Sequence, residues 1–227
     1  MIWLLVAVLL GALVGAPSSA PAAESAVVIP APAVNDVKAA GPVQTAVLAG
    51  GCFWGVQGVY EHVRGVRQVL SGYAGGDRAT ATYEAVSAGR TRHAESVQIR
   101  FDPKEISYGE ILQIFFSVVH DPTQLDYQGP DSGPQYRSNI FYASGSQRKI
   151  AEAYIAQLGQ AKVFGRDIVT RVDPLKAFYP AEEYHQDFLQ LNPGHPYIVI
   201  NDLPKIDSLR KVFPTYYREP PITVKGQ

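Results

Sequence analysis

The chain has 227 residues, 46% of them hydrophobic, with 20 Lys and Arg against 21 Asp and Glu and a formal net charge of −1. This length and composition suffice for one sizeable domain with a full apolar core. The balanced charge gives no electrostatic basis for binding nucleic acid or an anionic membrane surface, so neither is expected as a partner.

The N-terminal residues are expected to be separate from that domain. Residues 2–14 are apolar apart from Gly11, and small residues follow as far as Ala23. This pattern is typical of a secretory signal peptide, residues 1–23, although no Lys or Arg precedes the apolar run. It predicts export, to the periplasm; an uncleaved membrane anchor is the weaker alternative because the run is short for a span. Residues 24–44, rich in Ala, Pro and Val, are expected to be a flexible linker.

A catalytic domain is expected over residues 45–213, followed by a tail, residues 214–227, that wraps the surface or frays. Alternation, helical spacing and turn residues predict its elements in chain order. Strands are expected at Thr45–Ala49, Val66–Tyr73, Ala94–Phe101, Ser138–Tyr142 and Ile168–Val172. Helices are expected at Phe53–Val63, Tyr108–His120, Ser146–Gln160 with Ser146 as the N-cap, and Ala181–Leu191. Residues 121–137 are expected to form a long loop.

The order of these elements indicates the fold class. Strands and helices alternate irregularly, and several connections are too short for helical crossovers. We therefore expect an α+β fold, a two-layer sandwich with a mixed, largely antiparallel sheet, a ferredoxin-like core and long coil segments. A doubly wound nucleotide-binding sheet is disfavoured because Gly50-Gly51-x-x-x-Gly55 does not match G-x-G-x-x-G.

The one cysteine of the chain, Cys52, follows Gly50-Gly51 and lies between a predicted strand and a predicted helix. A single thiol cannot form an internal disulfide. The first turn of a helix has unpaired N–H groups and a partial positive charge, which favour the thiolate. The alternative is a small, buried, inert cysteine, which the flanking glycines disfavour because they open the backbone. We expect Cys52 to be the nucleophile, with the rings of Phe53 and Trp54 as an apolar wall for a small alkyl group.

The run Gly51-Cys52-Phe53-Trp54-Gly55 resembles the active-site motif of the A-type peptide methionine sulfoxide reductases. Seven more motifs occur in that family's order and approximate spacing. They are Gly72-Tyr73-Ala74-Gly75-Gly76, Tyr83-x-x-Val86, His93-Ala94-Glu95, Phe101-Asp102-Pro103, His120-Asp121-Pro122-Thr123, Gln128-Gly129-x-Asp131-x-Gly133-x-Gln135-Tyr136-Arg137-Ser138 and Ala181-Glu182-x-Tyr184-His185-Gln186. The resemblance covers roughly residues 45–190. It implies reduction of methionine-S-sulfoxide, free or in peptides and proteins, to methionine.

The chemistry of a sulfoxide explains which groups such a site needs. A thiolate attacks the electrophilic sulfur, while an acid with a raised pKa protonates the oxygen. The resemblance places this acid at Glu95. Alternation along Ala94–Phe101 puts Glu95 on the face that carries the apolar residues of the strand, where a carboxyl would be partly desolvated. An exposed carboxylate at a strand edge is the alternative.

The other site residues follow from the resemblance. Tyr83 and Tyr136 match the phenols that donate hydrogen bonds to the sulfoxide oxygen. Asp131 matches a loop carboxylate that helps to hold the site and its substrate, and a turn residue before a glycine is its alternative role. Gly51 and His185 are expected to border the substrate, although a lone histidine is more often structural.

Two stretches depart from the family pattern. Arg92 stands where the family has Gly before His-Ala-Glu, and Asp126-Tyr127 stands where it has Asn-Arg before Gln-Gly. Neither departure removes a proposed catalytic group.

No cysteine follows Cys52, whereas many family members carry one or two resolving cysteines near the C-terminus. Attack should therefore leave Cys52 as a sulfenic acid. An external thiol, thioredoxin-like, glutaredoxin-like or small, must then reduce it. No cofactor is expected, and no metal, because the five histidines and Cys52 lack ligand spacing. The expected role is repair of oxidised exported proteins by a monomer.

Two other function classes fit parts of the pattern. A cysteine hydrolase would use the same thiol and a histidine, and it would turn over amides or esters. An exported binding module would recognise oxidised methionine in an aromatic pocket without reducing it, and its function would survive Glu95→Gln.

Overall fold

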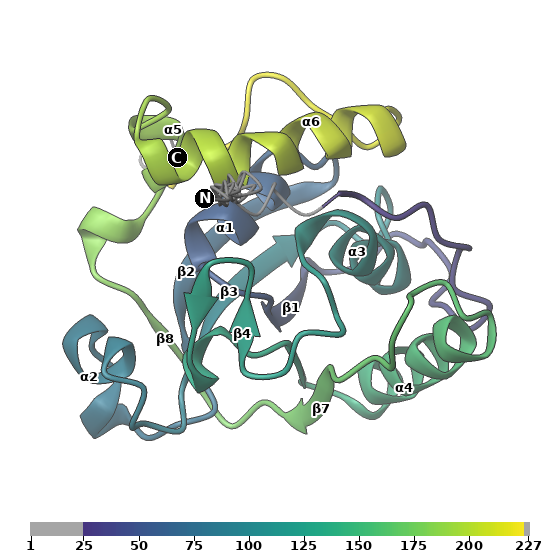
Figure 1. The fold of residues 1–227 in the computed structure, drawn as a ribbon. Helices are drawn as coiled ribbons and strands as arrows, with labels where there is room; N and C mark the ends of the chain where they lie inside the picture. Colours follow the sequence, from purple (N-terminus) through teal and green to yellow (C-terminus); the bar gives the residue numbers. More distant parts are fainter. Residues whose placement is uncertain (1–24, 225–227) are drawn as a thin grey trace, which may run out of the picture.

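A computed structural model describes residues 25–224 of the chain (Figure 1). The expected signal peptide and its alternative, a membrane anchor, lie outside the described residues. Between residues 25 and 224, no helix has both the length and the apolar character needed to cross a bilayer.

Two sheets and six α-helices make up the described chain. The larger sheet contains β1 (Gln44–Ala49), β2 (Val66–Ala74), β3 (Ala94–Phe101), β6 (Asn139–Tyr142), β7 (Arg171–Pro174) and β8 (Phe178–Pro180), and a hairpin contains β4 (Tyr127–Gln128) and β5 (Asp131–Ser132). The helices are α1 (Phe53–Glu61), α2 (Tyr83–Ser87), α3 (Tyr108–Ile114), α4 (Gly145–Gln160), α5 (Phe188–Leu191) and α6 (Leu203–Val212). Shorter 3₁₀ turns lie at Arg78–Thr80, Pro134–Tyr136 and Glu183–His185, and π turns lie at Phe115–Val119 and Ile198–Asp202.

The strand order of the larger sheet is β7-β6-β1-β3-β2-β8. Strands β6 and β7 pair in parallel, with α4 between them in the chain, and the other neighbouring strands pair antiparallel. The succession β1-α1-β2-β3-α3-β6, with β3 between β1 and β2 and with β6 outside β1, is the split βαβ arrangement of ferredoxin-like folds. The expected α+β fold with a mixed, largely antiparallel sheet is confirmed.

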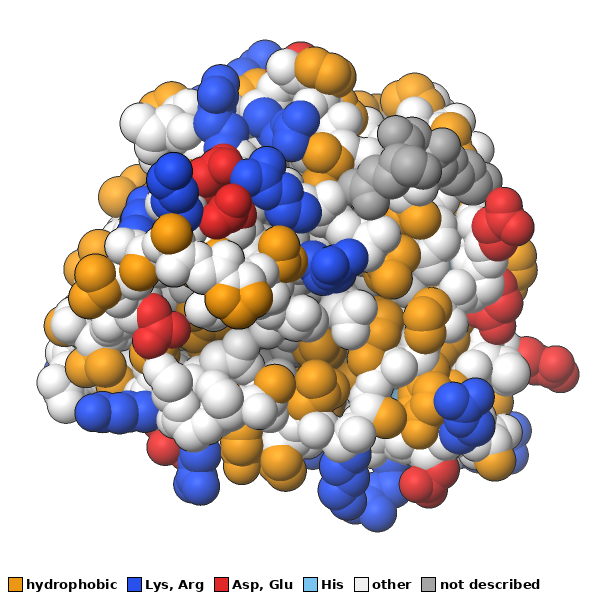
Figure 2. All heavy atoms as spheres, turned by 180° about the vertical axis from the view of Figure 1, so that it is seen from behind, with side chains coloured by type: hydrophobic (Ala, Val, Ile, Leu, Met, Phe, Trp, Pro, Cys, Tyr) orange, Lys and Arg blue, Asp and Glu red, His pale blue; other side chains and the backbone are white. Residues whose placement is uncertain are grey.

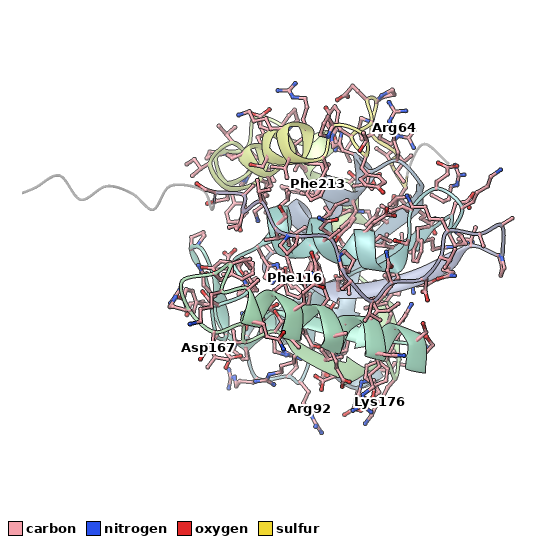
Figure 3. The ribbon with its side chains drawn as sticks, turned by 90° about the vertical axis from the view of Figure 1, so that its right-hand side faces the viewer. Arg64, Arg92, Phe116, Asp167, Lys176 and Phe213 are labelled. Atoms are coloured by element: carbon pink, nitrogen blue, oxygen red, sulfur yellow. The ribbon has the colours of Figure 1, made fainter. Side chains whose placement is uncertain are left out.

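The main core lies between one face of this sheet and the helices. Because side chains alternate along a strand, Ala46 and Leu48 of β1 face this core, while Val47 and Ala49 face a smaller apolar cluster on the opposite face. Figure 3 shows Phe116, from the π turn after α3, in the interior beside α4. Its ring meets Tyr154 of α4 edge-on at a centroid distance of 5.8 Å.

Several predicted elements have different bounds in the structure. The helix expected over Tyr108–His120 is α-helical only to Ile114 and then widens into the buried π turn, because the apolar run continues without a stop signal. The strand expected at Ile168–Val172 is β7, which begins at Arg171. Helix α4 is capped by Ser144, whose Oγ accepts from the backbone nitrogen of Gln147 at 3.2 Å.

Ser146, the expected cap of α4, lies inside the helix and donates to Asp36 instead. The helix expected over Ala181–Leu191 is also interrupted. Asp187 adopts a left-handed conformation with φ of 56°, and it separates the 3₁₀ turn at Glu183–His185 from α5. The side chain of Asp187 accepts a hydrogen bond from the backbone nitrogen of Val224 at 2.8 Å.

The segment expected to be a flexible linker makes specific contacts from residue 27 onward, along α3 and α4. Ile29 is 6% exposed. Tyr154 donates to the carbonyl of Pro30 at 2.7 Å, and Asn35 accepts from the backbone nitrogen of Gly109 at 3.0 Å. These partners lie more than 70 residues away in the chain, so composition alone could not reveal them.

The C-terminal part packs on α1. Sequence reasoning did not predict α6, although Leu203, Ile206 and Leu209 have helical spacing and Pro204 suits a first turn. Figure 1 shows α6 (yellow) lying beside α1. The tail wraps the surface as far as Val224: Tyr217 pairs with Val63, and the backbone nitrogen of Ile222 donates to the carbonyl of Glu61 at 3.0 Å.

Charged side chains of both signs are interspersed on the surface. Figure 2 shows this on the rear face, where acidic groups lie among basic ones. Arg67 pairs with Asp102 at 2.8 Å, and Arg210 pairs with Asp207 at 2.8 Å. Such exposed pairs contribute little to stability, since the median is about 0–1 kcal/mol.

Candidate active site

Two glycines, Gly50 and Gly51, connect β1 to Cys52 at the start of α1. Strand β1 ends at Ala49, and Gly50 and Gly51 lead to Cys52, the N-cap residue of α1. Gly51 has a φ of 93°, and a Cβ there would lie 2.6 Å from Cγ of Gln128 in β4. A Cβ at Gly50 would lie 2.9 Å from the ring of Phe115. Both glycines are therefore required for the hairpin and the π turn to pack beside Cys52, which remains half-buried.

Glu95 lies directly at the start of the same helix. It is 2% exposed, and its Oε2 accepts a hydrogen bond from the backbone nitrogen of Phe53 at 3.0 Å. Burial raises the pKa of Glu95 to about 8; the Phe53 N–H opposes this rise, and the nearby charge of Asp131 adds to it. The carboxyl is therefore mostly protonated near neutral pH, as a proton donor must be.

The thiol of Cys52 experiences a different environment from the one that the helix start alone predicts. Burial raises the pKa of the thiol well above its ordinary value, and the negative charges of Glu95, Asp202 and Asp131 raise it further. The backbone N–H of Trp54 acts in the opposite direction. The thiolate expected from the helix N-terminus is thus disfavoured, because burial and three carboxyl groups outweigh the helix.

Aromatic rings line one side of the site. Trp54 stacks on Phe188 with centroids 3.8 Å apart, and its Nε1 donates to Nδ1 of His185 at 3.1 Å. Because an indole nitrogen can only donate, Nδ1 of His185 is the acceptor and the proton of the neutral ring is on Nε2. Phe53 is 1% exposed and contacts Tyr73 and His185, so Trp54 supplies the accessible ring and Phe53 supports it from inside.

The two predicted phenols are both half-buried members of the site. Tyr83 begins α2 and lies 4.4 Å from the His185 ring, centroid to centroid. Tyr136 ends the 3₁₀ turn after the hairpin. Burial raises the pKa of each phenol, and the charges of Glu95 and Cys52 add to both shifts. Both hydroxyls are therefore protonated near neutral pH and can donate.

Asp131 connects the hairpin to a residue that sequence reasoning missed. Its Oδ2 accepts from the hydroxyl of Tyr197, and Tyr197 lies edge-on to Trp54 at a centroid distance of 5.9 Å. Burial raises the pKa of Asp131, while its bond with Tyr197 and the charge of Lys205 act against the rise. Tyr197, Lys205 and Asp202 all come after residue 190, beyond the motifs from which the site residues were predicted.

Asp202 and Lys205 form the innermost charged pair. Oδ1 of Asp202 lies 3.7 Å from Nζ of Lys205, and both side chains are buried. Burial raises the pKa of Asp202 to about 6, against the lowering effect of Lys205. The Asp-x-x-Lys spacing at the start of a helix was the available signal, but such a pair is usually solvent-exposed.

Together these residues supply the parts of a displacement at sulfur. One nucleophile, one carboxyl that holds a proton near neutral pH, two phenols and an apolar wall surround the same half-buried position. The structure brings the nine residues predicted for the site close to one another: Cys52, Glu95, Tyr83, Tyr136, Asp131, Phe53, Trp54, Gly51 and His185.

The family model and two of the most similar proteins all carry the description peptide methionine sulfoxide reductase. The family model for peptide methionine sulfoxide reductase matches residues 44–216. The peptide methionine sulfoxide reductase MsrA 2 of Mesorhizobium japonicum is 57% identical over 189 residues, covering 83% of this chain and 97% of that protein. The protein of the same name from Synechocystis is 53% identical over 189 residues, covering 82% and 88%.

Solved structures agree in fold. Mxr1 of Saccharomyces cerevisiae in its reduced form has a TM-score of 0.63 at 35% identity, covering 69% of this chain and 91% of that chain. Methionine sulfoxide reductase A of Corynebacterium diphtheriae has a TM-score of 0.58 at 30% identity, covering 77% and 87%. The family match spans every strand and helix that carries the site. The chain belongs to the peptide methionine sulfoxide reductase family.

Proposed function

We propose that this chain reduces the S epimer of methionine sulfoxide, free or in peptides and proteins, by attack of Cys52 and protonation by Glu95, and that it repairs oxidised exported proteins. Membership of the family establishes the coarser activity, thiol-dependent reduction of methionine sulfoxide. The observation that carries the mechanism is the 3.0 Å bond between Glu95 and the Phe53 nitrogen, which keeps a protonated carboxyl beside the residue that follows the thiol.

The first half-reaction transfers one oxygen atom. The methyl group of the sulfoxide lies against Trp54, and Tyr83 and Tyr136 donate hydrogen bonds to its oxygen. An electron pair of the Cys52 sulfur attacks the sulfoxide sulfur, and Glu95 protonates the oxygen, which then passes to Cys52. The proton that leaves the thiol replaces the one that Glu95 gave. In sum, a thiol and a sulfoxide become a sulfenic acid and a thioether.

The second half-reaction needs thiols from outside the chain, because Cys52 is its one cysteine. A first thiol attacks the sulfur of the sulfenic acid, so that a mixed disulfide forms and water leaves. A second thiol attacks the mixed disulfide and returns Cys52 to its reduced form. A thioredoxin-like protein, a glutaredoxin-like protein or a small thiol can fill this role.

The export part of the proposal rests on the sequence of residues 1–23, whose apolar run and small-residue end suit a signal peptide. Export would place the enzyme among proteins that meet oxidants directly. Fractionation of cells should find the shortened chain in the periplasm; recovery of the uncut chain from the cytoplasm would overturn this part alone.

One experiment tests the mechanism. Purified protein is mixed with methionine-S-sulfoxide without reductant, and methionine and protein mass are measured. We expect one methionine per chain, one added oxygen on Cys52, and no reaction with the R epimer. Continued turnover by Cys52→Ser, with thiol present, would exclude Cys52 as the nucleophile.

A further inference from the structure

Asp202 is a buried carboxylate that the mechanism above does not use. It is 0% exposed, and within residues 25–224 neither of its carboxylate oxygens has a hydrogen-bond partner. Burying a charged carboxylate without hydrogen bonds is costly, and such groups concentrate where they have a function. Asp202 therefore needs an explanation beyond packing.

The position of Asp202 supplies that explanation. Its Oδ1 lies against the first turn of α1, where a Cβ added at Gly55 would be only 2.1 Å away. Gly55 is the third residue of α1, the helix that begins directly after Cys52. The carboxylate is thus placed at the helix end whose unpaired N–H groups carry partial positive charge. A negative charge there cancels the property that would otherwise favour a thiolate at Cys52.

Lys205 compensates this charge only in part. Its Nζ lies 3.7 Å from Oδ1 of Asp202, longer than a hydrogen bond, and 3.4 Å from the Cβ position of Gly55. Both residues come from the C-terminal segment, since Asp202 is the N-cap of α6 and Lys205 lies in its first turn. That segment packs beside α1 in Figure 1.

Asp202 is one of three carboxyl groups whose charge acts on the Cys52 thiol, together with Glu95 and Asp131. Glu95, from β3, is mostly protonated near neutral pH, and Asp131, from β5, is bonded to the hydroxyl of Tyr197. The phenols that face Cys52 are neutral there: they are Tyr83, Tyr136 and Tyr197. The pKa of Asp202, about 6, leaves that carboxyl largely ionised.

We propose that Asp202 is a positioning residue that holds Cys52 in its thiol form while the active site is empty, through the negative charge it places at the first turn of α1. The inference rests on the proposed function, in which Cys52 is the nucleophile. A thiol reacts with peroxide far more slowly than a thiolate does. The chain has no second cysteine that could convert a sulfenic acid formed by peroxide into a disulfide. The charge of Asp202 therefore slows oxidation of Cys52 by peroxide until a sulfoxide binds.

The test measures the pH at which the Cys52 thiol ionises, with no sulfoxide present. The rate of alkylation by iodoacetamide is followed against pH for the unchanged chain and for Asp202→Asn, which keeps the shape and removes the charge. We expect the midpoint of the pH profile to fall, and alkylation near neutral pH to accelerate about tenfold for every pH unit by which it falls. Asp207→Asn is the matched control: Asp207 lies on the same helix, its side chain is 56% exposed, and it pairs with Arg210.

A second variant keeps the test valid if Asp202→Asn alone does not fold. Asp202→Asn leaves Lys205 buried without its partner, so Asp202→Asn with Lys205→Met removes both charges together. A lower midpoint in either folded variant, with Asp207→Asn unchanged, supports the proposal. A midpoint equal to that of the unchanged chain in both variants overturns it. Alkylation needs no sulfoxide, so an unchanged midpoint says nothing against the proposed function. The proposed function fails only if Cys52→Ser still turns over sulfoxide.

Discussion

Oε2 of Glu95 lies 3.0 Å from the backbone nitrogen of Phe53, so the residue that we propose as the acid also caps α1, the helix that follows Cys52. Cys52 makes no side-chain cap of its own for α1. The Glu95 carboxyl on β3 therefore has two proposed roles, capping α1 and donating a proton. Substitution can separate them, because only proton donation requires an acidic hydrogen.

Substitution of Glu95 should separate capping from catalysis. Glu95→Gln keeps an oxygen that can accept from Phe53, so stability should change little, whereas the single-turnover rate should fall by about 10²–10⁴ because the proton donor is gone. Glu95→Ala should lose the same activity and also about 1–2 kcal/mol of stability through the lost cap. Rapid-quench kinetics and thermal unfolding measure the two effects. Equal stability of the Gln and Ala variants would contradict the capping role.

The pH dependence should show Glu95 as the acid. With a pKa of about 8, the protonated form declines above that pH, so the single-turnover rate should fall there. Glu95→Gln should lack this decline. The same group affects stability: because burial raises its pKa from 4.5, its contribution is full below about pH 4.5 and is lost as pH rises toward 8. A rate that keeps rising well past pH 8 would exclude Glu95 as the donor.

The sequence could bring together the residues predicted for the site because they lie in contiguous motifs. Glu95 was placed on the buried face by simple alternation, and Cys52 at the helix start by the glycines before it. The ionisation state of Cys52 could not be predicted in the same way. It depends on burial and on the charges of Glu95, Asp202 and Asp131, and Asp202 lies 150 residues further along the chain, next to a helix that the sequence did not reveal.

The same limit explains the other differences. Residues 27–35 looked like a linker because their partners, such as Tyr154 and Gly109, are distant in the chain. Tyr197 carried no motif, and only folding brings its hydroxyl to Asp131. Local patterns thus predicted most of the elements and the position of Cys52 before α1, whereas contacts with the two terminal segments needed the structure.

The indole nitrogen of Trp54 should orient the aromatic wall through His185. Trp54→Phe keeps a ring for the methyl group but removes the donor to Nδ1 of His185, 3.1 Å away. We expect KM for the sulfoxide to rise severalfold and stability to fall by about 1 kcal/mol, the net value of one such bond. Steady-state kinetics with saturating thiol measures the first effect. If His185→Ala changes KM as Trp54→Phe does, the two act as one unit; an unchanged KM in both would show that the bond does not orient the wall.

Gly55 should tolerate no side chain, because Asp202 occupies the space that one would need. A Cβ at Gly55 would lie 2.1 Å from Oδ1 of Asp202, so Gly55→Ala should cost about 1–3 kcal/mol despite the better helix propensity of alanine. Gly159→Ala, in α4, is the matched control: a Cβ there meets nothing within 4 Å, and the change should stabilise the chain by about 0.5–1 kcal/mol. Combining Gly55→Ala with Asp202→Ala should cost less than the sum of the two single changes, since the clash can be lost only once. Denaturant unfolding of the four variants measures this coupling, and strict additivity would show that Asp202 does not rest on the first turn of α1.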